Sequence, residues 1–218
     1  MKSFPMRLLI AATATAGLLS ARAESLLGSS HVGGRAHLLQ FGDAIKDRIL
    51  GDAYLFDAFG ATPINKNVDT VIRAGYGAGS GKVGIVPVDY QSTTISTEFR
   101  YHFFPDEAIN PYLVGGPFVN RWVVDVDANP DLGLRALDAS ENLVGVMAGS
   151  GAEFQIYDTF LATVEFDLRL NTDQEVTAQA YGTFGYWLLP QLLTSVGLGY
   201  DSDESDQTYS LLATWKLP

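Results

Sequence analysis

The fold of this chain is decided by residues 160–171, which read FLATVEFDLRLN. In an extended strand, successive side chains point to opposite faces. One face of this stretch is apolar and holds Val164, Phe166, Leu168 and Leu170. The other face is polar and holds Thr163, Glu165, Asp167, Arg169 and Asn171. This alternation predicts a β-strand with two chemically opposed faces.

The same period of two recurs along most of the chain, most clearly in residues 93–103, 177–188 and 208–217. Counted back from the C-terminus, the predicted strands lie near 208–217, 191–200, 177–188, 159–171, 143–157, 111–125, 91–104, 69–79, 49–61 and 31–41. We therefore predict an all-β fold, an antiparallel up-and-down transmembrane β-barrel of ten strands. The two N-terminal strands are the weakest, and eight strands remain without them. Residues 42–52 fit a short helix or an outer loop.

Alternation alone does not distinguish a membrane barrel from a soluble β-sandwich or lipocalin fold, in which the apolar face points inward. The chain is 47% hydrophobic and 11% aromatic, yet no apolar run near 18 residues follows its N-terminal segment. Apolar residues spread thinly over strands are typical of a membrane barrel. The charged faces also mix both signs with glycine and serine, which suits a narrow lumen. We therefore expect the apolar faces to contact lipid.

Two sets of side chains follow from this orientation. In the lumen we expect a charge network of Arg73, Glu98, Arg100, Arg121, Glu153, Glu165, Asp167 and Arg169. At the two membrane interfaces we expect aromatic girdles. Their predicted members are Tyr112, Trp122, Tyr157, Tyr186, Trp187, Tyr200, Tyr209 and Trp215.

The connections also differ in length. Residues 104–111, 157–159 and 189–191 are expected to be short turns, whereas 80–90, 126–142 and 201–207 are expected to be longer polar loops. Short turns at one end and long loops at the other are typical of an outer-membrane barrel, with periplasmic turns and extracellular loops.

The first 23 residues have the features of an export signal. Lys2 and Arg7 precede an apolar core, and residues 21–23 form a small-x-small cleavage site. The core is too short for a membrane anchor, which needs about 20 apolar residues. We thus expect a cleaved signal over 1–23 and a barrel over 24–218, in the outer membrane of a diderm bacterium.

Charge and composition exclude several classes of function. Removal of the signal takes away three basic residues and no acid, so the net charge falls from −11 to −14. So acidic a chain is a poor partner for nucleic acid or for anionic lipid surfaces. The chain has no cysteine, which excludes thiol nucleophiles, thiolate metal sites and iron–sulfur clusters.

The histidines and the paired acids that could take part in catalysis or metal binding are interpreted as structural residues. His102 is about 13 Å along its strand from Glu98, too far for a hydrogen bond, and is interpreted as a lumen or interface residue. His31 and His37 are expected at the surface or in a loop. The pair Glu165 and Asp167 is interpreted as part of a salt-bridged lumen rather than as an acid/base or cation site.

Two further stretches are interpreted in the same way. The acidic loop 201–206 lacks the ligand spacing of a calcium loop and is interpreted as solvated. The glycines at 75, 77 and 79 lack the following helix of a nucleotide site. We expect no catalytic residue, metal site or cofactor.

Two stretches carry a resemblance to a known family. Residues 100–117, RYHFFPDEAINPYLVGGP, and residues 149–154, GSGAEF, resemble a strand–turn–strand junction of small outer-membrane barrels of the OmpA/OmpW-like superfamily. Such barrels usually end in a terminal aromatic that the assembly machinery reads. This chain departs from that pattern, since it ends in Trp215-Lys216-Leu217-Pro218.

The resemblance implies a structural, adhesive or small-solute role, and an enzyme in a few members. We expect a non-enzymatic barrel with a structural, adhesive or ligand-contacting role at the cell surface. A narrow channel for small solutes and a lipid-modifying enzyme are the alternatives. The expected partners are outer-membrane lipid and the barrel assembly machinery, and the expected state is a monomer.

Overall fold

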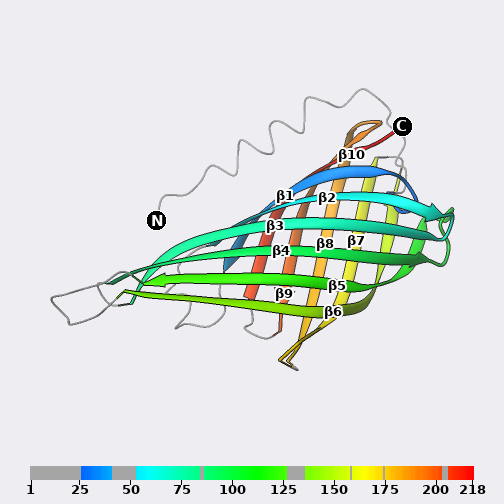
Figure 1. The fold of residues 1–218 in the computed structure, drawn as a ribbon. Helices are drawn as coiled ribbons and strands as arrows, with labels where there is room; N and C mark the ends of the chain where they lie inside the picture. Colours follow the sequence, from blue (N-terminus) through cyan, green and yellow to red (C-terminus); the bar gives the residue numbers. More distant parts are fainter. Residues whose placement is uncertain are drawn as a thin grey trace.

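The protein is a closed antiparallel β-barrel of ten strands (Figure 1). The structure, a computed structural model, describes residues 26–40, 53–83, 86–126, 136–157, 159–173, 175–202 and 206–218. The strands are β1 (His31–Gln40), β2 (Ala53–Asn65), β3 (Val68–Val83), β4 (Val86–His102), β5 (Ile109–Val126), β6 (Leu137–Ile156), β7 (Phe160–Asn171), β8 (Val176–Leu189), β9 (Leu192–Asp201) and β10 (Asp206–Lys216).

The barrel closes because β1 pairs with both β2 and β10. His31, for example, lies opposite Lys216 on one side and Ala61 on the other. Every other pair joins strands that are consecutive in sequence. The prediction of ten strands is therefore confirmed, and the eight-strand alternative is wrong. No helix capable of spanning a bilayer occurs in the residues that the structure describes.

The two ends of the barrel differ. One end, here the turn end, holds the beginning of β1, the end of β10 and the connections 66–67, 103–108, 157–159 and 190–191. At the opposite end, the loop end, β1, β3, β5, β7 and β9 finish and β2, β4, β6, β8 and β10 begin. The predicted loop at 80–90 is mostly wrong, because β3 continues to Val83 and β4 begins at Val86. The predicted loop at 126–142 is partly wrong, since β6 begins at Leu137.

Apolar side chains face outward in every strand. Phe166 and Leu168 are close to half exposed on β7, whereas Asp167 between them is buried. This is the orientation that the alternation of residues 160–171 predicts for a transmembrane barrel. In a soluble barrel the apolar face would be the buried one. The outward belt therefore provides the surface that hydrocarbon covers, and closure pairs the backbone groups that lipid cannot satisfy.

One side of the barrel wall is taller than the other. β3 to β6 have 16 to 20 residues, whereas the other six strands have 10 to 14, and the longer four reach past their neighbours in Figure 1. Crossing a bilayer takes about 9–11 residues. Near the loop end the outward side chains become polar, with Gln91, Arg121 and Asp125 exposed. This part of the wall consequently projects beyond the apolar belt.

Candidate functional site

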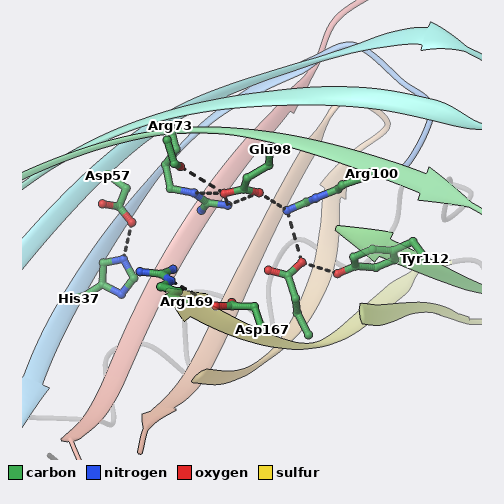
Figure 2. Close-up of polar contacts among 10 residues, drawn as sticks. His37, Asp57, Arg73, Glu98, Arg100, Tyr112, Asp167 and Arg169 are labelled. Carbon is green, nitrogen blue, oxygen red and sulfur yellow. Dashed lines mark hydrogen bonds and ion pairs between the residues drawn. The ribbon is translucent and has the colours of Figure 1, made fainter. Parts of the chain in front are cut away.

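The centre of the interior is an ion-pair network around Glu98 on β4. Arg73 donates from Nε to Glu98 Oε1 at 3.1 Å and from Nη2 to Oε2 at 3.3 Å. Arg100 donates from Nη2 to Glu98 Oε2 at 2.9 Å, and the same nitrogen lies 3.5 Å from Glu165 Oε2. The Glu98 carboxylate is only 5% exposed, so two guanidinium groups compensate one buried negative charge. Figure 2 shows the three side chains directed toward one another.

The network continues across the bore to β5 and β7. Tyr112 on β5 donates its hydroxyl to Glu165 Oε2 at 2.7 Å. Arg169 donates from Nε to Asp167 Oδ1 at 3.2 Å. The Tyr112–Glu165 bond joins strands that are not neighbours in the wall, since β5 and β7 are separated by β6, whereas Arg169 and Asp167 both lie on β7. The polar side chains therefore brace the barrel from inside, in addition to the backbone ladders.

The inward arginines of the described strands each lie over an aromatic ring. The distance from the guanidinium carbon to the ring centroid ranges from 4.6 to 5.7 Å. The pairs are Arg35 over Tyr181, Arg73 over Phe59, Arg100 over Tyr112 and Arg169 over Phe118. Such stacking is favourable for guanidinium and holds its plane in one orientation.

Glycines in the wall make room for these rings. A Cβ on Gly33 would meet the Phe59 ring, and one on Gly145 would meet the Phe118 ring. Gly151 lies in the same way under Tyr112, and Gly197 under Tyr181. Glycine is thus required here by close side-chain packing rather than by backbone conformation. Glycines that pack directly against aromatic rings therefore account for part of the chain's high glycine content.

A second polar group lies on β1 and its neighbours. His37 Nε2 bonds Asp57 Oδ2 at 2.8 Å across the β1–β2 pair. On the other side of β1 the Tyr181 hydroxyl bonds Ser210 Oγ at 2.5 Å. Gln179 donates to Asp201 Oδ2, also at 2.5 Å. His37, Asp57, Gln179, Tyr181 and Asp201 line one cavity of about 310 Å³ along the bore, together with the Glu98 network.

The turn end of this cavity is floored by residues 26–29. Leu26 packs against a buried cluster of Leu161, Trp187 and Leu193, and Leu27 packs against Tyr112 and Val114. The segment is a tight turn, because Ser29 N donates to Leu26 O at 3.1 Å. Gly28 has a φ of +74°, which a residue with a Cβ rarely adopts.

Hydrogen bonds hold this floor segment to the wall. Gly28 N donates to Asp69 Oδ2 at 3.3 Å, and Leu217 N donates to Ser30 O at 2.8 Å. Asp69 also lies 3.1 Å from His102 Nε2, and both side chains are fully buried. His102 therefore belongs to the interior. Its carboxylate neighbour Asp69 comes from the adjacent strand, which spacing along β4 alone could not reveal.

The structure places seven of the eight predicted network residues inside the barrel, but Arg121 is exposed on its outer face. Its predicted place in the lumen is therefore wrong. On β5 the inward residues Tyr112, Val114 and Phe118 are as bulky as the outward ones, so alternation does not reveal the inner face there. Arg121 instead lies beside Thr93 and Asn142, where the outward surface becomes polar.

The predicted interfacial aromatics divide into those on the outer face or at a turn and those inside the barrel. The five found on the outer face or at a turn are Tyr157, Tyr186, Tyr200, Tyr209 and Trp215. The three found inside are Tyr112, Trp122 and Trp187, so their predicted place at the interface is wrong. Trp122 stacks on Tyr90 at 5.9 Å, and Trp187 is 1% exposed. Exposed Tyr54, Tyr76 and Tyr101 are outward aromatics that the prediction missed.

Three other expectations need correction. His31 and His37 were expected at the surface or in a loop, but both face the interior, because β1 is part of the wall. Asp201 and Asp206 were expected in a solvated loop, but they are paired strand residues, and Asp206 is buried. Residues 203–205 of that loop, like 42–52 and the signal at 1–23, lie outside the described residues. The glycines at 77 and 79 have a packing role, because a Cβ on Gly77 would meet Ser92 and one on Gly79 would meet Tyr90.

No family model matches the sequence, and no curated protein matches it. Among solved structures, the translocator domain of the autotransporter NalP from Neisseria meningitidis matches 97% of this chain with 94% of its own, at 8% identity and a TM-score of 0.50. Neisserial surface protein A matches 86% of this chain with 97% of its own, at 14% identity and a TM-score of 0.42. A de novo designed transmembrane β-barrel matches 89% of this chain with 100% of its own, at 12% identity and a TM-score of 0.42.

Identities this low show a shared barrel fold and carry no information on activity. The function must therefore be argued from the two faces of the wall and from the interior. Within the described residues, no three histidine, aspartate or glutamate side chains are grouped to hold a metal ion.

Proposed function

We propose that this protein is a non-enzymatic β-barrel of the outer membrane of a diderm bacterium, with a structural, adhesive or ligand-contacting role at the cell surface. The observation that carries the proposal is that the apolar face of the wall points outward and the charged face points inward. Phe166, Leu198 and Val164 are about half exposed on the outside, whereas Glu98, Glu153 and Asp167 are buried inside. Only a hydrocarbon environment makes that arrangement favourable.

The filled interior supports a role at the surface rather than wide conduction. Guanidinium and carboxylate groups cross the bore at the level of Glu98, and Leu26 and Leu27 close the turn end. The projecting β3–β6 wall extends beyond the apolar belt and offers polar outward residues, including Gln91 and Asp125, to partners outside.

The buried His–Asp pair argues against a lipid-modifying enzyme. His102 and Asp69 have no exposed side-chain surface and lie beneath the Gly28 turn. A catalytic base has to come within hydrogen-bond reach of its substrate. Here Asp69 instead accepts the backbone N–H of Gly28, which is a structural contact.

Export and assembly are part of the proposal. Cleavage after Ala23 makes Leu26 and Leu27 the third and fourth residues of the mature chain. The assembly machinery would insert the chain despite its final Leu217-Pro218, and the outward belt would contact lipid as a monomer. N-terminal sequencing of the mature protein should begin at Glu24.

The test is fractionation combined with heat modifiability. The protein should sediment with the outer membrane, should need detergent for extraction, and should migrate faster on a gel when it is not heated. A matched variant, Phe166→Arg, should lose the fast-migrating form. Release of the wild-type protein into osmotic-shock fluid, without detergent, would contradict the proposal.

A narrow channel is the second candidate, because the cavity of about 310 Å³ runs along the bore. Planar-bilayer recording separates the two functions. The proposed closed barrel should give no steady conductance, whereas a regular unitary conductance in the wild type would establish the channel.

A further inference from the structure

Arg35 on β1 differs from the other inward arginines of the described strands. Arg73 and Arg100 bond Glu98, and Arg169 bonds Asp167. Arg35 has no such ion pair, and its buried Nε has no hydrogen-bond partner. Its contact is the ring of Tyr181, 4.6 Å from the guanidinium carbon, which is the closest stacking of the four.

The carboxylate that could neutralise Arg35 is engaged elsewhere. Asp57 lies directly opposite Arg35 in the β1–β2 ladder, but it bonds His37 Nε2 at 2.8 Å. The other acid that acts on Arg35, Glu165, accepts a hydrogen bond from Tyr112 at 2.7 Å and lies 3.5 Å from Arg100. A guanidinium has five N–H donors, so Arg35 keeps donors that the described side chains do not use.

The Tyr181 ring beneath Arg35 is held in place by residues of β9 and β10. The Tyr181 ring lies across β9, where Gly197 and Gly199 leave room for it, since a Cβ on Gly197 would meet both the Tyr181 hydroxyl and Ser210 Oγ. The hydroxyl bonds Ser210 on β10 at 2.5 Å. A stacked guanidinium exposes its donor edge, and that edge matches the two oxygens of a carboxylate.

We propose that Arg35, stacked on Tyr181, forms a binding site for a small organic carboxylate in the lumen cavity. Arg35, Gln179, Tyr181, Thr183, Asp201 and Thr208 all line the lumen cavity. Their hydroxyl and amide groups suit a hydroxylated anion. The volume of about 310 Å³ lies at the small end of ligand pockets, and the nearby Asp57 and Glu165 favour a single negative charge on the ligand.

The experiment measures binding by titration calorimetry on the folded barrel in detergent. The probes are acetate, lactate and gluconate, and glucose is the neutral control. At least one carboxylate should bind saturably, and glucose should not. Arg35→Gln should weaken that binding by about tenfold or more, as expected for the loss of a charge-assisted bidentate contact.

Arg169→Gln is the matched control, because it removes the same charge from an arginine that is already paired with Asp167. It should change the affinity by no more than about threefold, which corresponds to less than 1 kcal/mol. Arg35→Lys serves if Arg35→Gln fails to fold, and it should also weaken binding, because lysine keeps the charge but not the planar fork. The absence of saturable binding to the wild type, or equal weakening by Arg35→Gln and Arg169→Gln, would overturn the proposal.

Discussion

Asp57 lies directly across the β1–β2 ladder from Arg35, yet its carboxylate bonds His37 two residues farther along β1, at 2.8 Å. The ladder register therefore does not decide which charges pair inside this barrel. Pairing depends on how far each side chain reaches along and across the bore. The same holds for Glu98, which bonds Arg73 on the neighbouring strand and Arg100 on its own.

Glu98→Gln should strongly destabilise the barrel. The substitution leaves Arg73 and Arg100 buried without their shared carboxylate, and breaking a buried pair costs about 3–5 kcal/mol. The measurement is the unfolding midpoint in denaturant, followed by the loss of the fast-migrating gel form. Glu107→Gln, at an exposed turn position, is the control and should change stability by about 0.5 kcal/mol or less. Equal midpoints for the two variants would show that the network does not hold the wall.

Phe166→Arg should be destabilising because it places a charge in the outward apolar belt. Arginine on the lipid face near the bilayer centre costs about 2–4 kcal/mol, and near the interface about 0–1 kcal/mol. Gln91→Arg, on the outer face beyond the belt, is therefore the matched control. Refolding into lipid vesicles at a series of denaturant concentrations measures both. A neutral Phe166→Arg would mean that this face does not contact hydrocarbon.

Tyr112→Phe should reduce stability by removing the 2.7 Å hydrogen bond to Glu165. A hydrogen bond to a charged group contributes about 1.5–3 kcal/mol. Tyr101→Phe removes the same hydroxyl from a half-exposed outward tyrosine, so its effect should stay near about 0.5 kcal/mol. The difference between the two unfolding free energies is the quantity to measure. A larger loss of unfolding free energy for Tyr101→Phe than for Tyr112→Phe would contradict the position of Tyr112 inside the barrel.

Leu27→Ser should loosen the floor at the turn end. Leu27 is 7% exposed and packs on Tyr112 and Val114, and truncating such a buried leucine costs about 2–5 kcal/mol in soluble proteins. We expect transient conductance in planar bilayers that the wild type lacks. Leu217→Ser, at a leucine that is 40% exposed at the same end, is the control and should remain silent. The absence of conductance from both variants would show that the ion pairs at the level of Glu98 close the bore without help from residues 26–29.

Much of the fold was predictable from local pattern. Strict alternation in residues 160–171 and 93–103 assigns each side chain to a face, because the period of a strand is two regardless of what surrounds it. The count of ten strands and the outward direction of Phe166 and Leu168 followed from that period. Alternation failed on β5, where Tyr112 and Trp122 were placed outside and Arg121 inside, because both faces of that strand carry large side chains.

What the sequence by itself determined is which faces are apolar, how many strands there are and that no thiol chemistry is possible. Only the tertiary structure decided which ions meet. Arg35, His37 and Asp57 come from strands at the weakly patterned N-terminus, and Tyr181 reaches Arg35 across β9 and β10 only because Gly197 leaves space. A period of two specifies direction, whereas contacts across a closed bore depend on the stagger of ten strands, which the pattern of one strand does not encode.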